Sequence, residues 1–134
     1  MAKYHSAVLD IPMTACGDLN DYQYYFVKGA STAGWVELAN GSSNPMPLGI
    51  LQNDPRSLEE AVVRIMGTSK IYTIPAGAHK YGDFLMSSSA GQAEIHSGSG
   101  TAAGVAMDNV AAGASIYTEI LLFPVTNQVT DNTT

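Results

Sequence analysis

LGILQND, at residues 48–54, is a short apolar run that ends in polar turn formers. AGVAMDN, at residues 103–109, resembles it in pattern. Gly49 and Gly104 hold matching places in the two runs, and a glycine inside a strand marks a bulge or a close approach of backbone. Each run is therefore expected to form a short strand followed by a turn.

Other segments of the chain also have strand character. They are short, rich in β-branched and aromatic residues, and bounded by glycine or other turn formers. These segments are residues 24–27, 35–38, 70–74, 84–86 and 116–123. Short strands separated by glycine-rich turns are typical of barrels and sandwiches. The sequence therefore predicts an all-β fold, either a small barrel or a sandwich.

Residues 57–66 fit two interpretations. Ser57-Leu58-Glu59-Glu60 has the form of a capping box, and the apolar residues that follow have helical spacing. The β-branched pair Val62-Val63 and the glycine at position 67 permit a strand instead. Extending the match between the two runs places residues 61–66 opposite 116–121, which favours a strand. The fold is expected to contain at most this one short helix.

The chain divides into an arm, a domain and a tail. Residues 1–16 show no sustained period and are expected to form an extended N-terminal arm. Residues 17–125 are expected to form a single β-rich domain, and residues 126–134 a loose C-terminal tail.

Within that domain two halves, about 24–67 and 72–123, are weakly similar. GAxxxG occurs at 29–34 and again at 77–82, which adds to the match between the two apolar runs. The segment 87–100 is rich in Ser and Gly and is expected to be an exposed loop.

Composition excludes several classes of partner. The 134 residues suit one domain, and only 13% of them are charged. The net charge is −6, and the six basic residues are scattered, so neither nucleic acid nor an anionic membrane is an expected partner. No leader or membrane-spanning stretch is apparent, which indicates synthesis in a reducing cytoplasm. A weakly charged surface suits contact with other proteins.

Several segments, in this order and spacing, resemble the tailed-phage capsid decoration (head cement) protein family. The resemblance covers roughly residues 17–124 and is carried by residues 17–28, 48–55, 61–67, 103–107 and 111–124. It implies a small, β-tulip-like fold, usually a homotrimer, that docks on the outer shell where capsid subunits meet. It implies no cofactor and no catalysis. One departure is Leu58-Glu59-Glu60, where the family often has a glycine in the turn before the central strand.

The resemblance implies a structural virion protein that binds the exterior of an assembled capsid and stabilises it. Its partner would be the major capsid protein, and its place the outer capsid surface after synthesis in the host cytoplasm. One alternative is another virion component, in the tail or baseplate. A second is a carbohydrate-binding β-sandwich module, which would need an exposed aromatic platform. Separately, Tyr22, Tyr24, Tyr25 and Trp35 could be contact anchors of a protein interface, although core packing explains most of them.

The arm holds the candidate contact residues. Its apolar side chains would seek a surface on the capsid or on a neighbouring subunit. The candidates are Tyr4, Val8, Leu9, Ile11 and Met13.

No catalytic, cofactor-binding or metal-binding residue is predicted. Cys16 is the only cysteine, and a buried structural thiol is favoured over a pairing with His5, His79 or His96. The histidines lie too far apart in sequence to signal a metal site, even with Asp83, Glu94 and Asp108 nearby. The glycines of residues 98–104 have the wrong spacing for a dinucleotide loop, and a strand is expected to follow them.

Overall fold

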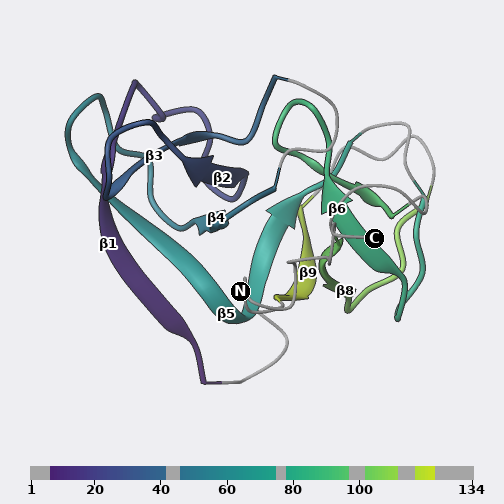
Figure 1. The fold of residues 1–134 in the computed structure, drawn as a ribbon. Helices are drawn as coiled ribbons and strands as arrows, with labels where there is room; N and C mark the ends of the chain where they lie inside the picture. The colour runs from purple at the N-terminus through teal and green to yellow at the C-terminus, as the bar shows by residue number, and fades with distance from the viewer. Residues whose placement is uncertain (1–6, 42–45, 75–77, 97–101, 112–116, 123–134) are drawn as a thin grey trace, which may run out of the picture.

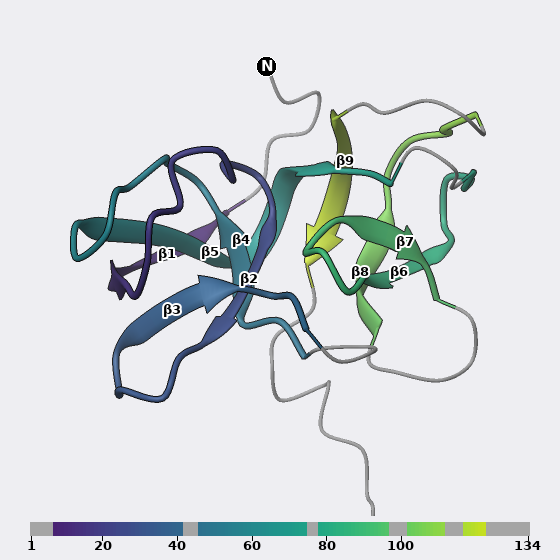
Figure 2. The same cartoon turned by 90° about the horizontal axis from the view of Figure 1, so that it is seen from above.

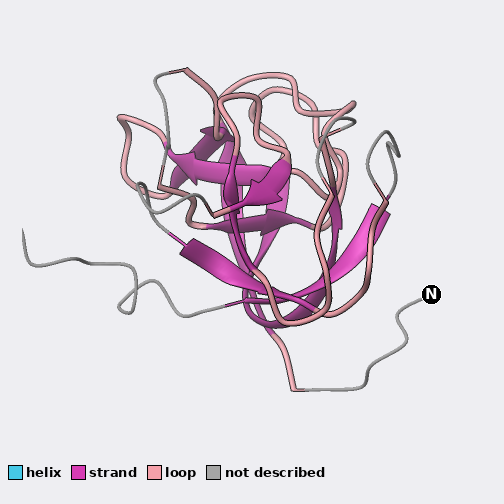
Figure 3. Cartoon of the chain, turned by 90° about the vertical axis from the view of Figure 1, so that its right-hand side faces the viewer, coloured by secondary structure: helices cyan, strands magenta, loops and turns pink. Residues whose placement is uncertain are grey.

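The computed structural model describes residues 7–41, 46–74, 78–96, 102–111 and 117–122. Throughout these residues the regular secondary structure is strand alone, as Figure 3 shows. The strands are β1 (Leu9–Ala15), β2 (Phe26–Gly29), β3 (Trp35–Leu38), β4 (Gly49–Leu51), β5 (Glu60–Tyr72), β6 (Phe84–Ser87), β7 (Ala93–Ile95), β8 (Ala102–Ala106) and β9 (Tyr117–Leu122). The all-β prediction is confirmed. No helix in the described residues could cross a membrane.

The first five strands close into a small barrel, on the left in Figure 2. β1 pairs antiparallel with β5 and parallel with β3, so the order β1-β3-β2-β4-β5 returns to its start. Each of these strands therefore has two neighbours, which removes the exposed edges of an open sheet. The interior includes Val27, Val36, Leu51 and Val63, all fully buried. Of the two predicted architectures, the barrel is the one observed.

β5 belongs to both parts of the molecule (Figure 1). Its first half pairs with β4 and β1, and its second half pairs with β9 from Gly67 to Tyr72. Gly67 has φ +96°, a value that L side chains rarely adopt, and the Ala7 carbonyl lies 2.5 Å from where its Cβ would be. A glycine is therefore required at the point where the strand passes from the barrel to the second sheet.

The second sheet continues from β5 in the order β9-β8-β6-β7. Its inner face forms a core with Ile71, Leu85 and Ile120, all fully buried. Phe26 and Ile50 belong to the same core, because they alternate with the barrel's inward residues and so point out of the barrel towards the second sheet. This core joins the two parts.

Residues 57–66 do not form a helix. The strand begins at Glu60, and Ala61 and Val63 alternate into the barrel interior. Pairing on both sides of β5 supplies more backbone hydrogen bonds and burial than a short exposed helix could, so tertiary context overrides the capping-box pattern. Leu58 lies in the turn before β5 with φ +70° and is 63% exposed.

The predicted arm contains β1. Apolar and polar residues alternate from Leu9 to Thr14, as in a strand. Pro12 interrupts this run, and because proline has no backbone N–H to donate, its presence weighs against predicting a strand here. In the structure Pro12 lies opposite Val62, and the strand continues on both sides of it. Residues 9–15 are extended, as an arm would be, yet they pair with their own chain. Residues 1–6 and the predicted tail, 126–134, lie outside the described residues.

Two other strand boundaries differ from the sequence interpretation. The predicted exposed loop 87–100 contains β7, a strand of three residues, which is too short to show a period of two. Ser87 and Ala93 are buried there. β2 begins at Phe26 rather than at residue 24, because Tyr24 adopts φ +70° and so lies in a turn.

The two halves of the chain repeat one strand arrangement. In the second half the far end of β5 takes the place of β1, and a parallel bridge between Thr73 and Ala93 matches the parallel β1–β3 pair. Equivalent strands also have equivalent registers: Phe26↔Ile50 with Phe84↔Val105, and Val27↔Gly49 with Leu85↔Gly104. Backbone hydrogen bonds repeat as well: Ala39 N to Phe26 O with His96 N to Phe84 O, and Gln52 N to Val62 O with Met107 N to Glu119 O.

This correspondence places the glycines of the sequence. Gly49 and Gly104 fall on equivalent positions, as the match between the two apolar runs predicts. Gly34 corresponds to Gly91, and both have positive φ (+84° and +79°) in a turn between equivalent strands. The GAxxxG match, which placed Gly34 with Gly82, is therefore wrong about the structural equivalence.

Candidate interaction surfaces

A row of apolar side chains crosses the outer face of the second sheet. Phe84 on β6 lies opposite Val105 on β8, which lies opposite Leu121 on β9. Directly paired residues of antiparallel strands point to the same face, so the three side chains are neighbours. Phe84 is 53% exposed and Leu121 38%. We call Phe84, Val105 and Leu121 the outer row.

Ile95 on β7 is 44% exposed as well, but it pairs with the buried Leu85 and so does not belong to the outer row. Sequence reasoning places Phe84 in a strand but does not single out the outer row. Apolar residues stand on both faces of β6, since Leu85 is buried and Phe84 is not. A strand that is apolar on both faces is the signal that could have found this surface.

A second apolar patch lies where β1 begins. Leu9 pairs with Met66, and Val8, Leu9 and Met66 are each between 42% and 44% exposed. Met13, a third candidate contact residue of the arm, packs against the barrel core instead.

The last two candidate contact residues of the arm are Ile11 and Tyr4. Ile11 lies opposite the buried Val63 and is itself partly buried. Tyr4 lies outside the described residues. Of the five candidates the structure thus exposes Val8 and Leu9, which lie side by side.

An ion pair fixes β1 beside this patch. Arg64 Nε donates to Asp10 Oδ1 at 2.8 Å, and Arg64 Nη2 donates to Asp10 Oδ2 at 3.0 Å. The hydrogen bond to Asp10 raises the pKa of the Arg64 guanidinium, against the opposing effect of burial. Two parallel bonds to one carboxylate hold the geometry more tightly than a single contact would. This ion pair therefore fixes the position of β1 directly after the exposed Val8 and Leu9.

Five tyrosines form a continuous cluster at the seam between the two parts. Neighbouring ring centroids lie 5.2 Å apart for Tyr22–Tyr25, 5.3 Å for Tyr25–Tyr72, 5.0 Å for Tyr72–Tyr117 and 5.6 Å for Tyr24–Tyr117. Three of the four contacts are edge-to-face, an arrangement that stabilises aromatic pairs. Only Tyr117 of the five is exposed. These rings pack on one another rather than form the flat platform that a carbohydrate-binding module needs.

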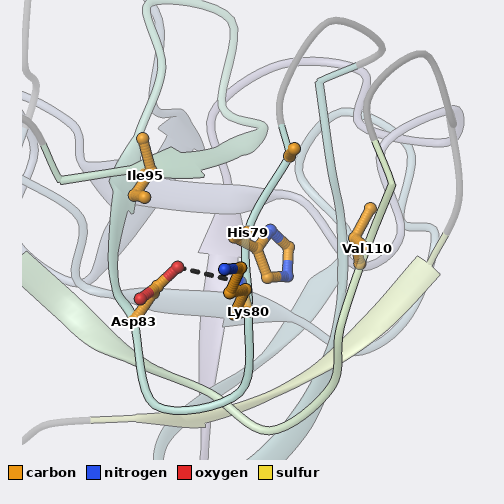
Figure 4. Close-up of a pocket in the computed structure, with 6 residues that line it drawn as sticks. His79, Lys80, Asp83, Ile95 and Val110 are labelled. Atoms are coloured by element: carbon orange, nitrogen blue, oxygen red, sulfur yellow. Dashed lines mark hydrogen bonds between the residues drawn. The ribbon is translucent and has the colours of Figure 1, made fainter.

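A hollow of roughly 390 Å³ lies beside His79, between Ile95 and Val110 (Figure 4). His79 is buried, and its Nε2 has no hydrogen-bond partner in the described part of the chain. Its backbone exchanges two hydrogen bonds with Val110, at 3.1 and 2.8 Å, which fixes its position. Burial lowers the pKa of His79, and the carboxylates of Asp83 and Asp108 partly oppose this. A buried, neutral imidazole is the state that this arrangement favours.

The other side chains with chemical potential do not assemble. Within the described residues no three His, Cys, Asp or Glu side chains could share a metal ion. Cys16 is exposed, not buried as the sequence favours. Burial raises the pKa of the Glu94 carboxyl. Residues 98–101 of the glycine-rich segment lie outside the described residues, and β8 follows them.

Solved structures share this fold. The chain matches the crystal structure of the head fiber gp8.5 N base of bacteriophage phi29 with a TM-score of 0.63 and 14% identity, over 87% of this chain and 95% of that chain. It matches a chain of the capsid of Myoviridae phage XM1 with a TM-score of 0.61 and 18% identity, over 87% of this chain and 83% of that chain. At these identities the likeness shows a common fold. Both neighbours are phage head components, which agrees with the capsid decoration family that the sequence resembles.

Comparisons at the level of sequence give no match. No protein-family model matches the chain, and no curated protein matches it.

Proposed function

We propose that this protein is a structural component of a phage virion that binds the exterior of the assembled capsid and stabilises it. The observation that carries the proposal is the fold match over 87% of the chain to two phage head components. The partner is the major capsid protein, the site is the outer capsid surface, and the protein is made in the host cytoplasm and acts without catalysis. A homotrimer is the expected assembly.

Two features of the surface support this proposal. Apolar side chains are exposed in groups, on the outer row and at Val8 and Leu9, and grouped apolar exposure marks protein interfaces more often than single residues do. Several such contacts made at once by one assembly add avidity without any single strong contact. Binding only the assembled shell stabilises that shell by mass action.

Co-sedimentation with heads that lack this protein tests the proposal. Purified protein mixed with expanded heads should pellet with them saturably, and the decorated heads should release their DNA at a higher temperature than bare ones. Protein that stays in the supernatant at every concentration, while it binds isolated tails or a glycan array, would contradict the proposal in favour of an alternative.

In our proposal Val8 and Leu9, at the start of the described chain, contact the capsid. Val8→Ser combined with Leu9→Ser should weaken head binding about tenfold, since two half-exposed apolar side chains lose their contact. Residues 10–15 are kept, because deleting them would open the barrel. Leu58→Asn is the control, as it removes an even more exposed apolar side chain from a turn that the proposal does not use. Equal binding by the two variants would show that the start of the chain is not a contact.

A further inference from the structure

The turn after β3 contains the only Asn-Gly pair of the sequence, Asn40-Gly41. In such a pair the peptide nitrogen of the glycine can attack the side-chain Cγ of the asparagine, because glycine has no side chain to obstruct the approach. A bond forms between Gly41 N and Asn40 Cγ, the bond from Cγ to Nδ2 breaks, and Nδ2 leaves as ammonia with the proton of the Gly41 N–H. Water then opens the succinimide ring at either carbonyl, which gives aspartate or isoaspartate. Asn40 is exposed, so water reaches it.

The peptide group that would react is held at both of its polar atoms. On one side, Lys28 Nζ donates to the Asn40 carbonyl oxygen at 2.8 Å. On the other, the Gly41 N–H donates at 3.1 Å to the carbonyl of Ser89, in the loop between β6 and β7. The carbonyl of residue 40 and the N–H of residue 41 belong to one planar unit, so the two bonds together fix its orientation.

Neighbouring contacts hold the turn as well. Asn40 forms an antiparallel bridge with Ala90. Ala39 is fully buried, and its N–H donates to Phe26 O at 3.0 Å. Gly41 has φ +102°, a conformation that glycine adopts without strain. The turn therefore has a defined conformation although Asn40 is exposed.

We infer that Asn40 is a deamidation site whose reaction is slowed by the contact between the two halves of the chain. Ring closure requires the Gly41 nitrogen to lose its proton and to turn towards Cγ, and both changes break the bond to Ser89 O. That bond also favours the protonated amide over its anion. The reaction therefore starts from the opened turn, and its rate follows the population of that opened state.

Lys28 acts on this reaction in two opposite ways. Its ammonium lies 3.8 Å from where a Cβ of Gly41 would be, and a positive charge so near favours loss of the Gly41 proton. Its bond to the Asn40 carbonyl opposes rotation of the same peptide. The second effect decides the rate in the folded protein, because the Gly41 N–H stays bonded to Ser89 O while the peptide is held.

Isoaspartate at position 40 would loosen the contact that slows its formation. Its main chain runs through Cγ and is one carbon longer. A longer backbone between Ala39 and Gly41 cannot keep both the bond to Phe26 O and the bond to Ser89 O at their present spacing. The modification also adds a negative charge to the present net charge of −6. It would therefore weaken the joint between the halves, and it does so whether or not the protein is on a capsid.

Peptide mass spectrometry at mildly alkaline pH tests the inference, since it separates asparagine from aspartate and isoaspartate. Asn40 in the folded protein should react at least about tenfold more slowly than in the chain unfolded by guanidinium chloride, because opening must come first. Asn109, which is followed by Val110, is the internal control and should react slowly in both states. Equal rates at Asn40 in the folded and unfolded chains would overturn the inference.

A change at Lys28 tests the role of the held peptide. Lys28→Met removes one of the two bonds and should speed deamidation of the folded protein about threefold. Lys28→Arg keeps a donor and should restore the wild-type rate. Glu37→Gln is the matched control, because it removes the carboxylate 3.9 Å from Lys28 Nζ and leaves the bond to the Asn40 carbonyl in place.

All four proteins, wild type included, should react alike in guanidinium chloride, where the turn no longer exists. Slower deamidation of folded Lys28→Met than of the wild type would overturn the inference, since Lys28 would then promote the reaction. A threefold gain that Lys28→Arg fails to reverse would also overturn it. Neither result bears on binding to heads, which is measured separately.

Discussion

At the scale of single residues, two glycines decide how closely the strands approach. A Cβ at Gly49 would collide with the carbonyl oxygen of Arg64, and a Cβ at Gly104 would collide with that of Leu121. Both contacts are with backbone of the paired strand, which cannot move without breaking the pair. The sequence locates these two positions because they recur in two similar runs, but it cannot tell a bulge from a close approach.

Gly104→Ala should lower the free energy of unfolding by about 1–3 kcal/mol, since the added methyl group pushes β8 from β9. Gly29→Ala is the matched control, because its Cβ would meet nothing within 4 Å, and it should change stability by less than about 1 kcal/mol. Urea denaturation of the three proteins measures both. Equal stability of the two variants would show that the contact at Gly104 does not hold.

Tyr24 is the counterpart of Gly82 in the other half, and both have positive φ. Tyr24 N donates to Leu51 O as Gly82 N donates to Ala106 O. A tyrosine costs roughly 1–2 kcal/mol in that conformation. Its ring contact with Tyr117 offsets part of that cost.

His79 should make stability depend on pH. Its pKa is lowered by burial, so below about pH 6.5, the ordinary value for histidine, the unfolded chain takes up a proton that the folded chain resists. Stability is therefore full above that pH and falls as the pH drops towards the lowered value. The melting temperature of the wild type should fall more between pH 7.5 and 5.5 than that of His79→Gln. Glu94 titrates in both proteins and cancels in the difference, so parallel curves would contradict this prediction.

At the scale of elements, β1 closes the barrel and β5 joins the two sheets. Sequence patterns find most of the strands because each is a short apolar or alternating run between turn formers. They miss β1, where Pro12 interrupts the pattern, and β7, whose three residues are too few to show one. Whether residues 60–66 are helix or strand depends on neighbours that are distant in sequence.

Asp10→Asn should loosen β1 and cost about 1 kcal/mol, since the two bonds to Arg64 are partly shielded from water. Glu37→Gln is the control, because the Lys28–Glu37 pair is 3.9 Å long and more exposed, so its loss should be close to neutral. Thermal melts at low and high salt measure both, and the Asp10 effect should shrink as salt rises. A larger loss for Glu37→Gln would contradict this assignment.

At the scale of the whole molecule, the chain is one strand arrangement used twice and joined through β5. The sequence shows this only where the backbone constrains it, at Gly49 and Gly104. Elsewhere equivalent positions hold different residues, such as Leu38 and Ile95. The GAxxxG match is therefore wrong about which glycines are structurally equivalent. The sequence does not show which candidate contact residues are exposed, because exposure depends on which side of a strand the fold covers: Val8 and Leu9 are exposed, and Met13 packs on the barrel core.

An image reconstruction of heads mixed with this protein tests the proposed role most directly. Binding to the capsid exterior predicts added density on the outer surface at regular lattice positions, into which the two joined sheets fit, and none on heads alone. Heads that look the same with and without the protein, or density only at the tail, would contradict it.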